Sequence, residues 1–141
     1  MRNYRYKVQT NTFGLFVGIT AELVRTDVPP RIGDPVSGRI WLDASQAQDA
    51  FRDTPLPLSD CQIDHLQAGL LKVADAIELI EDSGYLLVVV RALEIVDADY
   101  TDGALAPAIA GWATAEFGLT PHRVHASFNK TTQQYLFEWD N

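Results

Sequence analysis

Apolar and polar side chains alternate along the first part of the chain. Residues 4–8 place tyrosine and valine between arginine and lysine, and residues 15–23 continue the alternation. A period of two is typical of a half-buried β-strand, because successive side chains point to opposite faces of a sheet. We therefore expect two strands with a break near Asn11.

The period changes to three and four after Ser59, which predicts a helix. Ser59 and Gln62 have the form of a capping box at its amino end. Gly84 stands where the residue after the carboxyl end needs a positive φ. One helical face explains the apolar spacing, so we expect a buried stripe packed on the strand 86–90. The stripe comprises Ile63, Leu66, Leu70, Val73, Ile77 and Ile80.

The remaining elements follow at short intervals. Residues 85–96 contain a continuous apolar run that is typical of a central strand covered on both faces. Residues 103–117 predict a second helix closed by Gly118, and 124–128 with 135–139 predict a hairpin. A short strand is expected over 39–42, and the proline-containing stretch 43–58 is expected to be a surface connection.

These elements predict a single α+β domain over residues 1–141. We expect a mainly antiparallel sheet of five to seven strands with two helices packed on one face, a split β-α-β-like arrangement. Aromatic residues concentrate at the two ends of the chain, which could pair in one sheet; they are Tyr4, Tyr6, Phe13, Phe16, Tyr135, Phe137 and Trp139. The simpler interpretation is that these side chains pack in the core, and the alternative is that they form an exposed face for a protein partner.

Residues 63–117 resemble a known family in their pattern. A long apolar helix leads through Gly84 and Tyr85 into a hydrophobic strand, and an Ala-rich helix follows. This order resembles the fourth domain of translation elongation factor G, where an Asp-Gly-Ser/Thr-like turn precedes the second helix. The corresponding positions here are Asp99, Thr101, Asp102 and Gly103. The resemblance implies a split β-α-β fold and a translation-associated role.

The chain is acidic, with 19 acidic against 11 basic residues, a net charge of -8 and a pI near 4.6. This charge repels phosphate backbones and anionic lipid headgroups, so we expect neither nucleic acid nor membrane as a partner. The small basic cluster Arg2, Arg5 and Lys7 is interpreted as the solvent face of an edge strand. A single cysteine fits a reducing compartment, and a cytoplasmic location is expected.

Cys61 and His65 are the first candidates for chemistry. They lie four residues apart at the start of the predicted helix, where a helix amino terminus lowers a thiol pKa and an imidazole could accept the proton. With His122 and His125 they would complete a four-ligand zinc site. Residues three apart in a strand point to opposite faces, however, so we expect no metal and no cofactor.

Carboxylates around residues 94–102 are the second candidates. Asp97, Asp99 and Asp102 are spaced like part of a calcium loop, but Ala108 stands where the bidentate glutamate is required. Asp99 and Asp102 are better interpreted as turn formers and helix caps. A catalytic carboxylate pair with Glu94 or Asp97 is the alternative, and it would need a cleft.

The function expected from these features is that of a small acidic cytoplasmic interaction protein without catalysis. It would neutralise or regulate a basic protein partner, as an immunity protein does for a toxin. The alternatives are a translation- or ribosome-associated protein, and a small enzyme using Cys61 and His65 or the 97–102 carboxylates. A homo-oligomer is left open. The expected partner-binding residues are Trp41, Glu94, Asp97, Asp99, Asp102, Tyr135 and Trp139.

Overall fold

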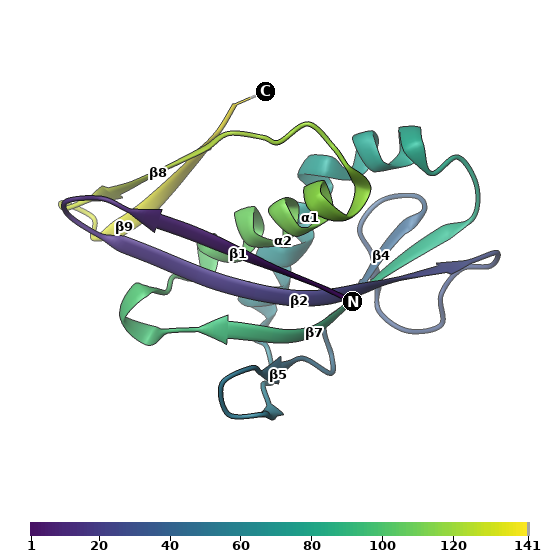
Figure 1. The fold of residues 1–141 in the computed structure, drawn as a ribbon, viewed down its shortest axis with the longest axis horizontal. Helices are drawn as coiled ribbons and strands as arrows, with labels where there is room; N and C mark the ends of the chain where they lie inside the picture. The colour runs from purple at the N-terminus through teal and green to yellow at the C-terminus, as the bar shows by residue number, and fades with distance from the viewer. Residues whose placement is uncertain (141) are drawn as a thin grey trace.

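A curved sheet with two helices on one face forms the body of the protein (Figure 1). The computed structural model describes residues 1–140 and shows the single α+β domain that the sequence predicts. Its helices are α1 (Asp60–Ile80) and α2 (Leu105–Phe117), with short 3₁₀ turns at Asp97–Asp99 and Asp102–Ala104. Its strands are β1 (Arg2–Gln9), β2 (Gly14–Thr26), β3 (Asp34–Pro35), β4 (Ile40–Asp43), β5 (Gln48–Asp49), β6 (Thr54–Pro55), β7 (Tyr85–Ile95), β8 (Val124–Asn129) and β9 (Gln134–Trp139).

The sheet is mixed, because its central strand has neighbours of both directions. The strand order is β1-β2-β7-β4-β3, and β5 also pairs with β7 and carries β6 at its other side. The β1–β2 and β2–β7 pairs are antiparallel, whereas β4 and β5 run parallel to β7. The parallel pairs arise because the chain returns from β4 to β7 through α1, a crossover that a tight hairpin cannot make.

The central position of β7 confirms the prediction from its apolar run. All five residues from Leu86 to Val90 are buried. The expected surface connection over 43–58 is only partly irregular, since β5 and β6 form a short hairpin within it and Ala44 and Ala47 are buried. These two alanines anchor the connection to the core.

Helix α1 begins as predicted but ends differently. Ser59 accepts a hydrogen bond from the Gln62 amide at 3.1 Å, and the Gln62 side chain accepts one from the Ser59 amide at 2.9 Å. The buried stripe is confirmed from Leu66 to Ile77, and Ile63 is half-buried. Ile80 was wrongly included: it is 54% exposed, because the last turn of α1 extends past the core. Gly84 does have a positive φ of 75°, but it lies in the turn before β7 rather than at the helix end.

Helix α2 packs closely on both α1 and β1 through two glycines. A Cβ at Gly69 of α1 would stand 2.3 Å from the Ala106 carbonyl oxygen of α2. A Cβ at Gly111 of α2 would stand 2.3 Å from the Tyr4 ring of β1. Gly118 ends α2 with φ 67°, as expected. The absence of a side chain at Gly69 and Gly111 therefore allows α2 to lie this close to α1 and β1.

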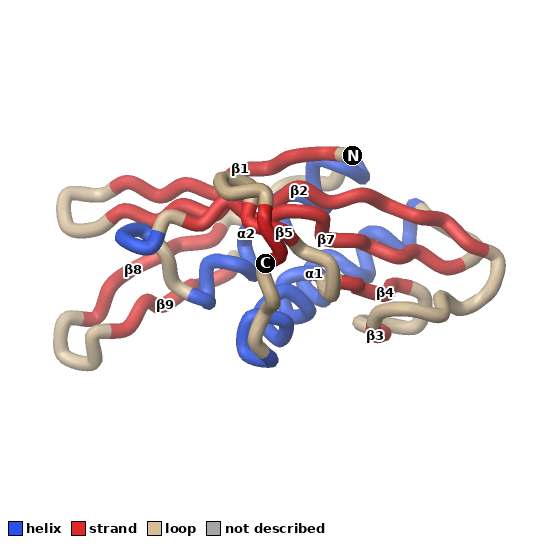
Figure 2. Tube along the Cα trace, turned by 90° about the horizontal axis from the view of Figure 1, so that it is seen from below, coloured by secondary structure: helices blue, strands red, loops and turns tan. Residues whose placement is uncertain are grey.

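The two chain ends do not pair in one sheet. Strands β8 and β9 form a separate two-stranded sheet, so that part of the prediction is wrong. The hairpins β1–β2 and β8–β9 point toward the same end of the molecule (Figures 1 and 2). There Phe13 meets Tyr135 edge to face, with ring centroids 5.4 Å apart. The ends are joined by side-chain packing instead of a backbone ladder, with Phe137 and Trp139 packed against the core.

Candidate functional site

The seven residues expected to bind a partner do not share one surface. Trp41 and Glu94 lie on the sheet face opposite the helices, as the neighbours of β7 and β2 show by their register. Asp97, Asp99 and Asp102 lie in the turns that follow β7. Tyr135 and Trp139 belong to β9. These residues are therefore considered in three groups.

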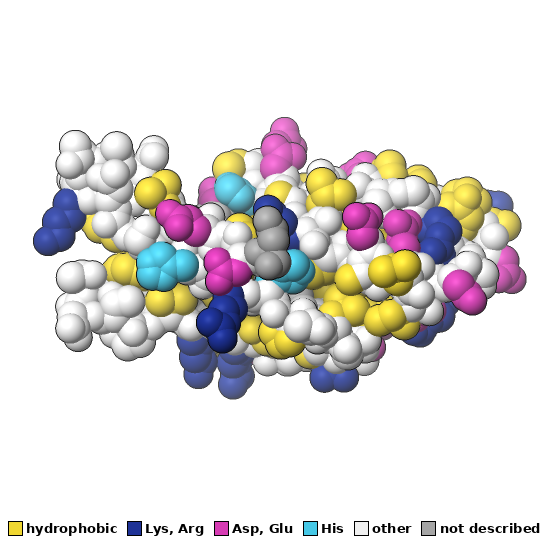
Figure 3. Space-filling model, turned by 90° about the horizontal axis from the view of Figure 1, so that it is seen from above, with side chains coloured by type: hydrophobic (Ala, Val, Ile, Leu, Met, Phe, Trp, Pro, Cys, Tyr) yellow, Lys and Arg dark blue, Asp and Glu magenta, His cyan; other side chains and the backbone are white. Residues whose placement is uncertain are grey.

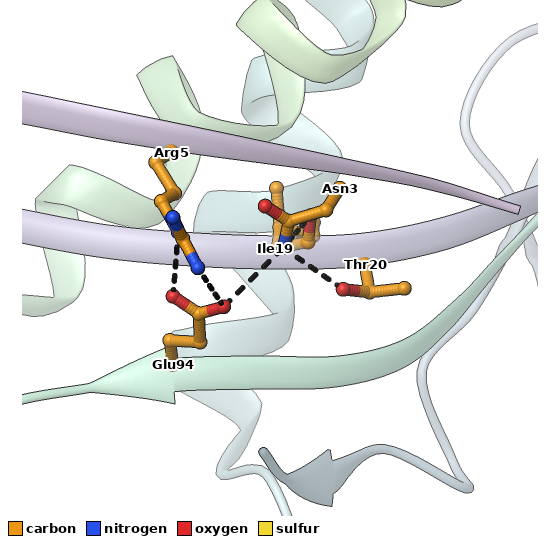
Figure 4. A network of polar contacts seen from close by, with 5 residues as sticks. All are labelled: Asn3, Arg5, Ile19, Thr20 and Glu94. Atoms are coloured by element: carbon orange, nitrogen blue, oxygen red, sulfur yellow. Dashed lines mark hydrogen bonds and ion pairs between the residues drawn. The ribbon is translucent and has the colours of Figure 1, made fainter. Parts of the chain in front are cut away.

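Glu94 holds the sheet together instead of facing solvent freely. Its carboxylate accepts hydrogen bonds from Arg5 of β1 at 3.0 and 3.3 Å and from Asn3 at 3.4 Å (Figure 4). The carboxylate reaches across β2 where Gly18 stands, and a Cβ there would lie 2.5 Å from its oxygen. The bond raises the Arg5 pKa. Glu94 thus acts as a clamp that fastens the outer strand β1 to β7.

The three aromatic candidates are engaged within the protein. Tyr135 contacts Phe128 at 4.9 Å between ring centroids, and the Lys72 ammonium lies 5.4 Å from the centre of the Trp139 ring. Both rings are half-buried and fasten the β8–β9 hairpin to the body. Trp41 is half-buried beside Leu87. None of the three is the exposed anchor that a binding surface needs.

Five aspartates lie on two segments, the start of α1 and the turns after β7, which together we call the acidic end: Asp60, Asp64, Asp97, Asp99 and Asp102. The start of α1 packs against the turns after β7. There the side-chain amide nitrogen of Gln62 donates a hydrogen bond to the Tyr100 hydroxyl at 3.0 Å. That hydroxyl in turn donates to Asp102 at 2.7 Å. Asp102 is thereby placed beside the start of α1, which carries Asp60 and Asp64.

None of these five aspartates takes part in an ion pair within residues 1–140. Within residues 1–140, all five ion pairs join an arginine to a glutamate: Arg2–Glu116, Arg5–Glu94, Arg25–Glu81, Arg39–Glu78 and Arg91–Glu22. Asp60, Asp64 and Asp97 are exposed. The charges of these three carboxylates therefore face solvent.

Exposed apolar side chains border the acidic end. Phe51 is 60% exposed and Val96 is 41% exposed. Both line a shallow hollow of about 370 Å³ together with Asp99 and with Lys7 and Phe16 of the β1–β2 hairpin. An exposed phenyl ring beside charged side chains, here Asp99 and Lys7, is the combination that protein interfaces use, an apolar centre with a charged rim.

The cysteine lacks the environment of a nucleophile. Cys61 is exposed, and its pKa is raised by desolvation and by the carboxylates of Asp102 and Asp64. A nucleophilic thiol needs the opposite shift. Asp102 is already the acceptor for the Tyr100 hydroxyl. This geometry favours neither the Cys61–His65 pair nor Asp102 as a general base.

Three of the four conceivable zinc ligands lie in two separate places. Cys61 and His65 are at the start of α1, whereas His122 lines a hollow with Leu79 and Ile80 at the other end of that helix. The 15 residues from His65 to Ile80 span roughly 22 Å of helix. Within residues 1–140 no group of three or more such side chains is placed to hold a metal ion.

Sequence reasoning missed Phe51, Asp60 and Asp64. Phe51 lies in the stretch taken as a surface connection, and only the pairing of β5 with β7 brings it beside Val96. The two aspartates carried a detectable signal, because the start of α1 had to lie near the end of β7 if the helix crosses the sheet. No pattern in the sequence predicted the groove beside β1.

Comparison with known proteins adds no family. No protein-family model matches the chain, and no curated protein matches it in sequence. The similarity to elongation factor G therefore stays a hypothesis from the sequence pattern. No helix among residues 1–140 has the length and apolar character to span a membrane.

Proposed function

We propose that this chain is a small non-catalytic interaction protein that covers a basic surface of a protein partner, as an immunity protein covers a toxin. The proposed contact surface is the acidic end with the adjoining Phe51 and Val96. One observation carries the proposal: the carboxylate of Asp99, which takes part in no ion pair within residues 1–140, lines one hollow with the exposed ring of Phe51, although the protein pairs five of its six glutamates internally.

The charge and the ring would act at different stages of binding. Carboxylates at the rim attract a basic partner over about 8–10 Å and so accelerate encounter. An aromatic side chain that becomes buried in the complex chiefly slows dissociation. Phe51 replaces Trp41, Tyr135 and Trp139 as the proposed anchor, because all three of those rings are half-buried, and Tyr135 and Trp139 already contact other side chains of the protein.

The proposed function excludes catalysis by the Cys61 thiol for a physical reason. The raised pKa of Cys61 keeps the thiol protonated near neutral pH. The alternatives predicted from the sequence, an enzyme using Cys61 and a ribosome-associated protein, give different outcomes in the experiment that follows.

The test compares the protein with two surface variants. The tagged chain captures proteins from its source cells, and the captured partner is then purified for stopped-flow kinetics. In the Asp97→Asn/Asp99→Asn variant the association rate should fall several-fold and lose part of its salt dependence. Phe51→Ala should raise the dissociation rate about tenfold with little change in association. Leu79→Ala, at an 85% exposed position near the far end of α1, is the matched control and should change neither rate.

Three outcomes would contradict the proposal. The first is a captured partner whose kinetics are indifferent to all three variants. The second is co-sedimentation of the protein with ribosomes at physiological salt, which would favour the translation alternative. The third is loss of cellular function in Cys61→Ser with the fold intact by circular dichroism, which would favour the enzyme.

A further inference from the structure

The outer edge of β1 is an unused strand edge. β1 is the last strand on its side of the sheet and pairs only with β2. Its hairpin closes with the Thr10 amide donating to the Phe13 carbonyl at 2.9 Å. Because bonded and non-bonded pairs alternate along an antiparallel ladder, the backbone groups of Asn3, Arg5 and Lys7 point away from β2. Within residues 1–140 no other backbone group pairs with them.

A groove runs beside this edge. It has a volume of about 660 Å³ and lies between β1, α2 and the segment that leads into and out of the β8–β9 hairpin. Its floor is formed by Tyr4 and Tyr6 with Gly111 of α2, and its far wall by Trp139. The first residue of β1 is bonded to α2, because the Trp112 indole donates a hydrogen bond to the Arg2 carbonyl oxygen at 3.1 Å. The accessible part of the edge therefore extends from Asn3 to Lys7.

One polar atom on the groove floor has no partner. Within residues 1–140 the Tyr6 hydroxyl is the single buried side-chain oxygen or nitrogen without a hydrogen bond. Buried polar groups without a partner are rare in folded proteins. Because this oxygen is itself shielded, an added segment would meet the exposed part of the Tyr6 ring and not the hydroxyl.

The charge around the groove selects the occupant. Arg5, Lys7 and His122 line it and no Asp or Glu does, although the chain carries 19 acidic residues. Arg5 is paired with Glu94, whereas Lys7 forms no ion pair within residues 1–140. Viewed from above, Lys and Arg side chains gather along the lower edge of the molecule (Figure 3). A second copy pairing through β1 would bring these cations opposite their equivalents, which is unfavourable.

We propose that the β1 edge and its groove bind an extended acidic segment of a partner protein as an added strand. The backbone of that segment pairs with Asn3, Arg5 and Lys7. Its apolar side chains face Tyr4, Tyr6 and Trp139, and its carboxylates alternate onto the side of Lys7. The groove adjoins the hollow of Phe51 and Asp99 at Lys7, whereas Tyr4, Tyr6 and Trp139 line the groove alone. The peptide assay tests the groove and the partner kinetics test the acidic end, so failure of one proposal is distinguishable from failure of the other.

The probe is a short synthetic peptide that alternates valine and glutamate and carries a fluorescent dye. Its binding is followed by fluorescence anisotropy, and amide hydrogen exchange is followed by NMR. We expect the peptide to bind about tenfold more tightly than a valine–lysine peptide and to slow exchange at the Arg5 and Lys7 amides. A peptide with alternate amides N-methylated should lose binding to the unaltered protein, because it cannot form the ladder.

Two substitutions at one position separate charge from backbone pairing. Lys7→Ala should weaken binding about threefold, the effect of one exposed charge pair. Lys7→Pro also removes the free N–H, which an edge strand tolerates, and should abolish binding. Lys130→Ala, an exposed lysine at the tip of the β8–β9 hairpin, is the control and should bind normally.

Three results of the peptide experiments would overturn the proposal. They are equal binding of the N-methylated peptide, tighter binding of the valine–lysine peptide, and unchanged exchange at Arg5 and Lys7 with bound peptide. A dimer in sedimentation that Lys7→Pro dissociates would assign the edge to a second copy and would also overturn it.

Discussion

Two tyrosine hydroxyls withdrawn from solvent differ in their partners. Tyr100 donates to Asp102 and accepts from Gln62, whereas the buried Tyr6 hydroxyl has no partner within residues 1–140. Tyr100→Phe should cost about 1–2 kcal/mol of unfolding free energy, since it strips two hydrogen bonds. Tyr6→Phe should leave stability unchanged or raise it by up to about 1 kcal/mol. Urea unfolding of both variants measures the difference, and a larger loss for Tyr6→Phe would contradict it.

The same burial makes stability depend on alkaline pH. Burial raises the pKa of Tyr6 from 10.0 to about 12. Between these values the unfolded chain loses the proton and the folded protein keeps it, so the contribution of Tyr6 is complete below pH 10 and is lost as pH rises to about 12. In Tyr6→Phe the free energy of unfolding should fall less steeply over this pH range. Equal decline in the variant would show that Tyr6 does not carry it.

At the scale of the element, α1 offers a matched pair of substitutions. Leu70 lies fully buried in the centre of its stripe, and Ile80 lies exposed on the last turn. Leu70→Ala should cost about 2–5 kcal/mol, as core truncations do. Ile80→Ala should cost less than about 0.5 kcal/mol. Thermal and urea unfolding of the two variants test this, and similar costs would place Ile80 in the core.

The elements differ in how far the sequence predicts them. Both long helices, β7 and the terminal hairpin follow from periodicity and caps, because Ser59, Gln62 and Gly118 act on their immediate neighbours. The exposure of Ile80 does not follow, since a periodic pattern gives the face of a helix but not where the sheet beneath it stops. The short strands β3, β5 and β6 have two residues each and leave no periodic signal.

At the scale of the whole molecule, we predict that folding needs no metal. His122 lies near the far end of α1 from Cys61 and His65. A chelator such as EDTA should therefore leave the melting temperature unchanged. Stoichiometric zinc in the purified protein, with a melting temperature that falls on chelation, would contradict this.

The candidate surfaces depend on long-range assembly, and so they were the least predictable part. Asp97, Asp99 and Asp102 were identified from the sequence, but their association with Asp60 and Asp64 needs the packing of α1 on the turns after β7. Glu94 was expected at the surface, yet Gly18 opens a path for it to reach Arg5 two strands away. Such contacts join residues about 90 positions apart, beyond any local pattern.

The central place of β7 has a consequence for synthesis. On the ribosome β2 emerges long before β7, which follows it by about 60 residues and supplies the partner for its whole inner edge. At 5–20 residues per second, the nascent β1–β2 hairpin waits for about 3–12 seconds with one side of β2 unpaired. During this interval the apolar face of Val17 and Ile19 is uncovered. We therefore expect nascent chains of this protein to need protection by chaperones until translation passes Ile95.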